Sequence, residues 1–318
     1  MLSAALVITL TLLYVGLLFV IALYAQKRQR ENRSIVNNST VYTLSLAVFL
    51  TSWTYYGSVG RAATSGLDFL PIYLGPTLVA FCWWFTVRKL VRICKANKIV
   101  SIADFISSRY GKSVSLGALV TLFTLIGITP YIALQLKAVS RTFDIITTAN
   151  ISGVHILSQH YGALPAFIDT AFVFSVVLGL FAILFGARTL DSSESHDGMV
   201  ATIAFESIVK LVALLLVGVY VTYFLFDGFS DVFTQATTQF PHITQAFLLG
   251  KSGSTSYATW FSLTFISMAA VMFLPRQFHM LVIENNNEEH IRGAMWKFPA
   301  YMFLITLFAT PIAMRGFC

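Results

Sequence analysis

The sequence carries little charge. Only 11% of its 318 residues are Asp, Glu, Lys or Arg, 57% are hydrophobic, and the mean hydropathy is +0.75. A soluble globular domain has about 25% charged residues, which it needs to cover its surface. The composition therefore excludes an ordinary soluble protein and predicts an all-α integral membrane protein.

Cysteine is also scarce. The three cysteines, Cys82, Cys94 and Cys318, have no CxxC spacing and no even pairing, so neither a disulfide framework nor a thiolate metal site is predicted. Two histidines, His155 and His160, are five residues apart, whereas a helical zinc pair needs a spacing of four. We therefore expect no metal site and no cofactor built from these residues.

The net charge of +7 does not indicate nucleic-acid binding. That function would need a basic patch interleaved with aromatic residues on a soluble face, and the sequence shows none. Nucleic acid is not an expected partner. The first apolar run also lacks the basic region and the small-residue cleavage site of a signal peptide, so it predicts a retained anchor.

Long apolar runs divide the chain into about eight segments. A helix needs about 20 residues to cross a bilayer, and each run reaches or approaches that length. The expected spans lie near residues 3–25, 41–62, 68–87, 114–136, 166–186, 198–226, 257–275 and 298–316.

Lysine and arginine are unevenly divided between the two sides of these spans. Fifteen fall in the first, third, fifth and seventh connections and five on the opposite side, while Lys210 alone lies inside a span. Positive residues accumulate in short cytoplasmic loops. This distribution predicts that the amino terminus is outside and that the lipid bilayer is the immediate partner of the chain.

The segment 41–65 is apolar and of membrane length, but glycines interrupt it. Free backbone groups in hydrocarbon persist only where they face protein or a wet cavity. We therefore expect the helix to unwind near Gly57 and Gly60, and a small solute to bind there. The candidate binding residues on this segment are Thr51, Ser52, Trp53, Tyr55, Tyr56, Gly57 and Ser58.

Two opposite charges lie inside the sixth predicted span. Glu206 and Lys210 are four residues apart with Glu first, the favourable order for a helical ion pair. Each charge near a bilayer centre costs about 2.5–3.5 kcal/mol on insertion scales. Two interpretations remain open: mutual neutralisation on a buried face, or coupling of this core to an output.

Four ordered motifs carry a family resemblance. The string TYYGSVGRAATSGL covers residues 54–67, VSIADFISSRYG covers 100–111, PYIALQ covers 130–135, and a looser match covers 193–198. Together they resemble the sodium/solute symporter family. The resemblance implies an inverted-repeat fold of five plus five helices, with substrate held near the midplane between the broken first and sixth core helices.

A fifth segment narrows the resemblance. The string FLPRQFH at 273–279, with Glu284, Asn285 and 288–290 after it, is similar to the transporter-like input module of CbrA-type sensor histidine kinases, as is FESIVK at 205–210. This resemblance implies a bacterial inner membrane and a histidine-like nutrient. It also implies a kinase domain beyond residue 318, which would use ATP and address a response regulator. Glu194, Glu206 and Lys210 would couple the two parts.

The resemblance also divides the chain. Residues 1–26 would be an extra amino-terminal helix, 41–226 the first repeat, and 257–318 the start of the second repeat, so the fold would be truncated after about eight helices. The third and sixth core helices would contribute Tyr131, Gln135 and Ser267 to the substrate site, together with Ser262 and Met268.

Sodium coupling is a weaker expectation. Proline-carrying symporters have a carboxylate at the position of Phe49, and the family takes sodium ligands from an eighth core helix that this chain does not reach. No catalytic residues are predicted. Two alternatives to the kinase-linked module stay open: a plain sodium-coupled symporter, and a receptor that never transports.

Overall fold

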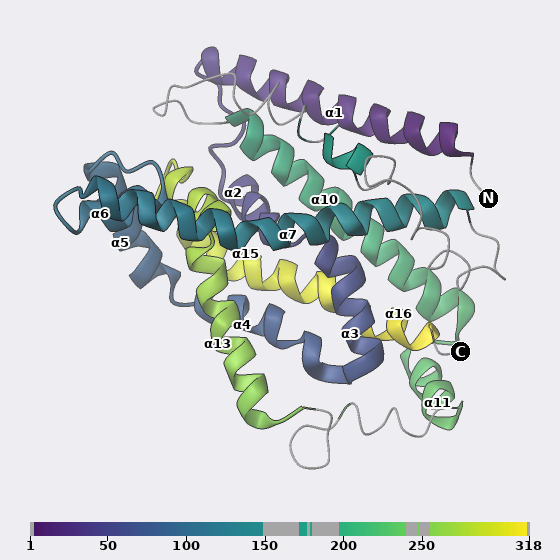
Figure 1. The fold of residues 1–318 in the computed structure, drawn as a ribbon. Coiled ribbons are helices and arrows are strands. Elements are labelled where there is room, and N and C mark those ends of the chain that lie inside the picture. Colours follow the sequence, from purple (N-terminus) through teal and green to yellow (C-terminus); the bar gives the residue numbers. More distant parts are fainter. Residues whose placement is uncertain are drawn as a thin grey trace. The chain divides into compact units, whose positions relative to one another are not determined.

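The structure is a computed structural model that describes residues 3–148, 172–176, 179, 197–239, 247 and 255–316. It divides into two compact units, which we treat separately. One comprises Met1–Val20 and Leu119–Ser195, and the other Ile21–Ala118 and His196–Cys318. Every regular element in the described residues is a helix (Figure 1), which confirms the all-α expectation.

Within the described part of the chain, four helical runs are long and apolar enough to cross a membrane. They are α1 (Ala4–Arg30), α7 (Val114–Thr148), α10 (Asp197–Tyr220), which continues as a π-helical turn to Leu225, and the run Glu289–Arg315, which contains α15 (Glu289–Thr306) and α16 (Ala309–Arg315). A fifth is obtained if the bent pair α13 (Tyr257–Phe273) and Pro275–Ile283 is counted as one span.

The other expected spans have different outcomes. Shorter apolar helices, Ser39–Phe49 and Pro71–Ala80, occupy the second and third. The third is two helices rather than one, because a turn at Phe81 and Cys82 separates α4 (Pro71–Ala80) from α5 (Trp83–Ala96). The span 166–186 lies mostly outside the described residues.

The last predicted span starts too late. Its helix begins at Glu289 rather than near residue 298, and Pro299 lies inside it. Proline is common in the first turn of a helix, so Pro299 would suit a helix start near residue 298. In the structure the helix instead begins at Glu289, because polar turns precede the apolar run and continue the same helix. Hydropathy marks the membrane-length part of a helix and misses such an extension.

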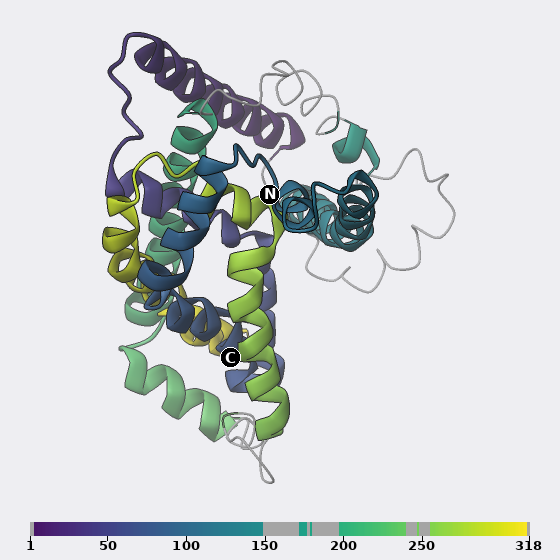
Figure 2. The same cartoon turned by 90° about the vertical axis from the view of Figure 1, so that its left-hand side faces the viewer.

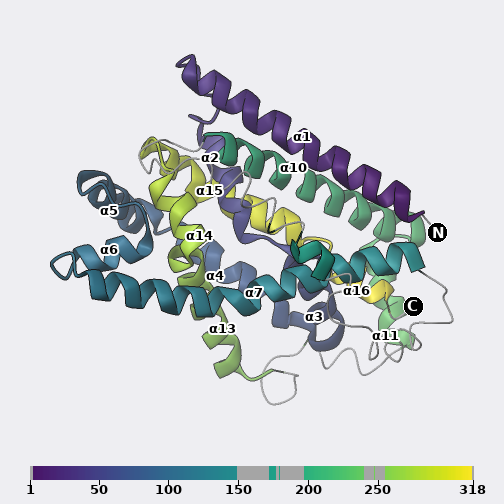
Figure 3. The ribbon, with the colours of Figure 1, turned by 45° about the horizontal axis from the view of Figure 1, so that its top comes forward.

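The second unit is built around two short helices, each of which packs on two longer ones (Figures 2 and 3). Helix α2 (Ser39–Leu46) packs on α10 and α15, and α4 packs on α13 and α15. Helix α3 (Ser58–Ser65) packs on α16, which also contacts α11 (Phe229–Gln239). Helix α6 (Ile102–Ser108), capped by the Ser101 hydroxyl, also belongs to this unit.

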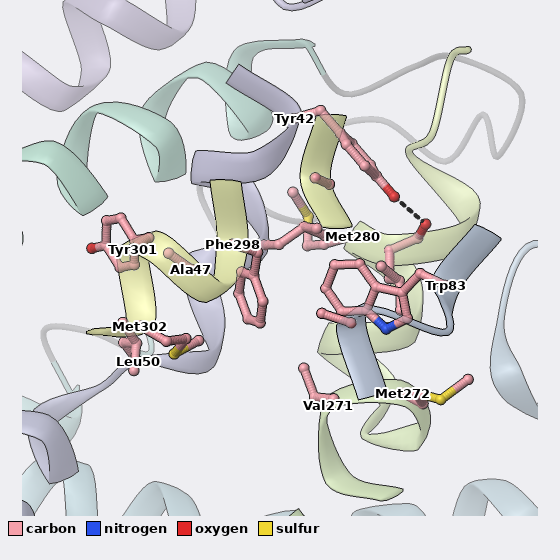
Figure 4. Packing of buried hydrophobic residues seen from close by; sticks show 14 of the residues in the cluster. Tyr42, Ala47, Leu50, Trp83, Val271, Met272, Met280, Phe298, Tyr301 and Met302 are labelled. Atoms are coloured by element: carbon pink, nitrogen blue, oxygen red, sulfur yellow. Dashed lines mark hydrogen bonds between the residues drawn. The ribbon is translucent and has the colours of Figure 1, made fainter. Parts of the chain in front are cut away.

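Large side chains from four helices fill the core of this unit (Figure 4). Trp83 of α5 is fully buried, and its ring centroid lies 5.1 Å from that of Phe298 on α15. Val271 and Met272 of α13 lie beside them. Gly75 permits the close approach of α4 to α13, because a Cβ there would lie 2.5 Å from the Thr264 carbonyl oxygen.

The outer faces of the same helices stay apolar. Phe261 on α13 is 71% exposed, and Trp296 on α15 is 69% exposed. Large aromatic side chains on the outside of a soluble protein are unfavourable, whereas they suit lipid. The exposed aromatic side chains agree with the membrane assignment made from hydropathy.

In the other unit, α7 is one long helix. It passes Pro130 without ending, and it carries Tyr131 and Gln135. The ring centroids of Phe143 and Phe174 are 5.7 Å apart, so this helix packs against residues 172–176.

Candidate functional site

The second predicted span is broken, although not where the glycines predicted. Helix α2 and a short 3-10 turn (Ala47–Phe49) end at Leu50, which is extended, with φ −88° and ψ 118°. A π-helical turn (Trp53–Gly57) then leads into α3. Gly57 and Gly60 are both helical, so the expected unwinding at these glycines is wrong in position, and the break lies at Leu50 and Thr51.

The break leaves the Leu50 carbonyl without its helical partner. In a continuous α-helix this oxygen would accept the Thr54 amide, but Thr54 donates to the Thr51 carbonyl at 2.9 Å instead. The Lys210 ammonium replaces it, donating to the Leu50 oxygen at 3.2 Å. A charged donor from α10 therefore satisfies the backbone group that the break exposes.

The same residue also holds the other side of the break. The Tyr55 hydroxyl, five residues beyond Leu50, donates to the Lys210 carbonyl at 3.0 Å. Lys210 is thus bonded through its side chain to one half of the broken helix and through its backbone to the other. Tyr301 of α15 steadies this part of α10, because its hydroxyl donates to the Ser207 carbonyl at 2.8 Å.

Glu206 neutralises Lys210, as its spacing predicted. The carboxylate lies 2.6 Å from the ammonium, with 36% of the Glu206 side chain and 21% of the Lys210 side chain exposed. Lys210 is near the middle of the 29-residue apolar run Asp197–Leu225. An unpaired charge at that depth costs about 2.5–3.5 kcal/mol, so the pair makes the ammonium tolerable there.

The second break lies at Leu274, and proline causes it. Pro275 has no amide hydrogen, and a residue before proline disfavours the α conformation. Leu274 is accordingly extended, with ψ 133°, and the helix bends by 53° between α13 and the run Pro275–Ile283. The Leu274 carbonyl accepts the Phe278 amide at 2.8 Å, so helix α14 (Pro275–Phe278) starts at once.

Hydrogen bonds join the two broken helices. Gln277 of α14 is fully buried, and its Nε2 donates to the Leu46 carbonyl at 3.0 Å. The Tyr42 hydroxyl of α2 donates to the Leu281 carbonyl at 2.7 Å (Figure 4). Segments more than 200 residues apart in sequence therefore lie side by side, with both discontinuities in the same region.

Several buried polar atoms in this region have no hydrogen-bond partner among the described residues. They include Gln277 Oε1 and both side-chain polar atoms of Asn285. The Tyr73 hydroxyl lies near Thr54 and Ser58 but forms no bond of ordinary geometry with either. Buried polar atoms without partners are costly, and they are found where a ligand or water completes the bonding.

Aromatic rings cover the turn after the first break. A Cβ at Gly57 would lie 2.5 Å from the Trp53 ring, so the indole rests directly on this glycine. The Trp53 and Tyr73 ring centroids are 6.3 Å apart. Tyr56 points away from this cluster and is 49% exposed.

Four further predicted site residues lie in three places. Ser267 is buried where α13 meets Gly75 of α4. Tyr131 and Gln135 belong to the other unit, so their role stays a prediction. Glu194 lies outside the described residues.

A separate ion cluster holds the loop that follows the second broken helix. Arg92 and Arg88 of α5 donate to the Glu288 carboxylate, at 2.7 Å and 3.1 Å from their Nε atoms. These hydrogen bonds lower the pKa of Glu288 to about 2. Lys95 donates to the Asn286 carbonyl at 3.0 Å, so three basic residues of α5 fasten this loop.

The described residues contain no group of three or more His, Cys, Asp or Glu side chains that could hold a metal ion. What this region offers is one carboxylate–ammonium pair, hydroxyls, amides and aromatic rings. Such groups can bind and orient a small polar molecule.

Sequence reasoning missed several of these residues. The sequence of 273–279 was noticed only for its resemblance, although Pro275 alone predicts a break. Gln277 had a usable signal, because an amide in an apolar run needs a buried partner. No sequence signal could have identified the Leu50 carbonyl, since every residue contributes a backbone carbonyl.

Comparisons with known proteins give two relatives in Bacillus subtilis (strain 168). The chain is 28% identical over 240 residues to "Uncharacterized symporter YhjB", which covers 74% of this chain and 42% of that protein. It is 30% identical over 130 residues to "Uncharacterized symporter YodF", which covers 40% of this chain and 26% of that protein. The chain thus spans less than half the length of these relatives.

No family model and no solved structure matches the chain. The two relatives support a relationship with symporters. Neither relative is named as a sensor kinase, so the kinase-linked interpretation stays a prediction from residues 205–210 and 273–290.

Proposed function

We propose that this chain forms the membrane core of a symporter-like secondary transporter, and that a small solute binds beside the two helix breaks. One observation carries the proposal: two discontinuous helices, far apart in sequence, are hydrogen-bonded to each other in a chain that is similar to symporters. Discontinuous helices at mid-membrane depth are the usual place where transporters hold substrate.

The chemistry of the region suits a zwitterionic amino acid. Hydroxyls and amides near the breaks can bond an ammonium and a carboxylate group, and Trp53 and Tyr73 supply aromatic faces for a cation or a ring. The histidine-like nutrient implied by the family resemblance fits this description. The inverted repeat, the outside amino terminus and the bacterial inner membrane belong to the same proposal, whereas sodium dependence stays a prediction from the family resemblance.

Uptake tests the proposal directly. The full-length protein would be purified, reconstituted in liposomes and assayed with labelled amino acids, beginning with histidine. We expect uptake above that of empty liposomes and a loss of at least about tenfold in Trp53→Ala, because truncating a partly buried aromatic anchor removes about 1.4 kcal/mol or more of binding. Trp296→Ala, at an exposed tryptophan, is the matched control.

Absence of uptake with any amino acid, together with binding of one of them to the purified protein, would favour a receptor over a transporter. Equal loss in Trp53→Ala and Trp296→Ala would contradict the assignment of the site to the first break.

The kinase-linked module is a narrower form of the proposal. It requires a phosphoacceptor histidine motif and glycine-rich ATP-binding boxes in the coding sequence beyond residue 318, and a response regulator that accepts the phosphoryl group. A reading frame that continues only with membrane spans would contradict it and leave the plain symporter.

A further inference from the structure

The first break holds a cation that belongs to the chain. The Lys210 ammonium has two oxygen partners, the Glu206 carboxylate at 2.6 Å and the Leu50 carbonyl at 3.2 Å. Unwound backbone carbonyls coordinate sodium at the broken helices of transporters. Carboxylate oxygens are likewise ligands that hard cations prefer. The side chain therefore satisfies the oxygens that a bound monovalent cation would require.

The backbone around the ammonium is held in place. Tyr55 donates to the Lys210 carbonyl and Tyr301 of α15 donates to the Ser207 carbonyl, so α10 is bonded both to the broken helix and to α15. The helical spacing of four residues also holds Glu206 next to Lys210. The carboxylate and the ammonium are thus positioned by α10, and the Leu50 carbonyl by the broken helix.

We propose that Lys210 is a tethered cation that takes the place of a sodium ion at the first helix break, so that this site does not require sodium. The proposal deepens the transporter function and rests on it. It departs from the expectation of sodium coupling that the family resemblance raised.

The proposal predicts that sodium can replace the side chain once the ammonium is removed. In Lys210→Met the Glu206 carboxylate and the Leu50 carbonyl lose their cation, and a small hard cation with oxygen affinity can enter between them. In Glu206→Gln/Lys210→Met the carboxylate is absent, and sodium has no anionic ligand. Lys210→Arg retains a fixed positive charge.

The experiment measures the melting temperature of the purified full-length protein in sodium chloride and in choline chloride at equal ionic strength. We expect the wild type and Lys210→Arg to melt at the same temperature in both salts. In choline chloride, Lys210→Met should have a lower melting temperature than the wild type. In sodium chloride its melting temperature should rise by about 2–4 °C, because sodium binding stabilises the folded state. Glu206→Gln/Lys210→Met should show no sodium response.

Lys297→Met is the matched control. Lys297 donates to the Thr40 hydroxyl at 2.8 Å, away from the break, so removing its charge should create no sodium response. If Lys210→Met is not recovered from membranes, Lys210→Gln replaces it with the same expected gain.

Sodium stabilisation of the wild type and Lys210→Arg equal to that of Lys210→Met would overturn the proposal, and so would a Lys210→Met or Lys210→Gln variant that does not respond to sodium. No solute is present in this measurement. A failure of the transporter proposal, which uptake reveals, is therefore distinguishable from a failure of the tethered cation.

Discussion

The two helix breaks differ in where their unpaired backbone groups find partners. At the second break, Pro275 removes an amide, and the Leu274 carbonyl bonds to Phe278 only four residues later. At the first break, the Leu50 carbonyl bonds to Lys210, 160 residues away. One discontinuity is encoded locally, and the other exists because a distant helix stabilises it.

This difference explains why glycine was a poor guide. Gly57 and Gly60 make a helix easier to unwind, but they do not supply a partner for the groups that unwinding frees. The chain opens where a charged donor is available. A break in a membrane helix is therefore located by its partners as much as by its flexibility.

Breaking the ion pair at the first break should have the largest effect. Glu206→Gln leaves the Lys210 ammonium uncompensated and should lower the free energy of unfolding by about 2 kcal/mol. This loss is smaller than the loss on breaking a fully buried ion pair, because 36% of the Glu206 side chain is exposed. Detergent-titration unfolding of the full-length protein measures this loss.

Glu206→Gln/Lys210→Met removes both charges and should recover part of this loss, because no buried charge is left unpaired, while the Leu50 carbonyl still lacks its donor. A double variant as unstable as the single one would show that the charges themselves, rather than their pairing, hold the break.

A glycine comparison separates flexibility from space at the same break. Gly57→Ala should destabilise by about 1–2 kcal/mol, because its Cβ would lie 2.5 Å from the Trp53 indole and the ring must move. Gly60→Ala has nothing within 4 Å and should be neutral or slightly stabilising, as expected for alanine in a helix.

Unfolding titrations together with tryptophan emission spectra test this pair, and only Gly57→Ala should shift the emission. Similar destabilisation by both variants would mean that helix flexibility, which the glycines were first thought to provide, is required after all.

The contact between the two breaks should contribute less. Gln277→Leu leaves the Leu46 carbonyl without its donor, which lowers the free energy of unfolding. The net loss should be only about 1 kcal/mol, because the leucine also removes the unpartnered Gln277 Oε1. The exposed Gln235, whose side chain donates to Asp231 on its own helix, provides Gln235→Leu as a control.

Equal unfolding free energies for Gln277→Leu and the wild type would indicate that packing alone aligns the two broken helices. A loss confined to Gln277→Leu would show that the second break, although locally encoded, is positioned by the first.

The loop cluster should give the smallest change, and it depends on pH. The pKa of Glu288 is lowered to about 2, so its ion pairs with Arg92 and Arg88 stabilise the folded state above the ordinary carboxyl pKa and lose this effect as pH falls towards about 2. Glu288→Gln should melt slightly below the wild type at neutral pH.

That difference in melting temperature should shrink as pH falls from about 4.5 towards about 2, and it should also shrink in high salt. Glu289→Gln, at the exposed first residue of α15, is the control. A pH-independent difference would show that Glu288 acts through packing and not through its charge.

Sequence reasoning predicted much of the framework. Long apolar runs located α1, α7, α10 and α13 to within a few residues at their starts, since hydropathy alone marks a membrane-length helix. The spacing of Glu206 and Lys210 predicted their ion pair, because neighbours on one helix face are set by helical geometry.

The site was less predictable. The prediction that Trp53 and Tyr55 bind a solute is not tested, and the sequence did not predict that Tyr55 bonds to α10 or that Trp53 lies over Gly57. Whether a residue faces a solute or another helix depends on which helix packs beside it. That information lies in contacts between residues far apart in sequence.

The sequence by itself determined that this is a helical membrane protein, where most of its long helices run, that proline bends the helix at Leu274, and that Glu206 and Lys210 pair. These are local properties of composition, spacing and backbone chemistry. Only the tertiary structure decided that the first helix opens at Leu50, because a freed carbonyl is stable in an apolar core only when a donor from another helix reaches it.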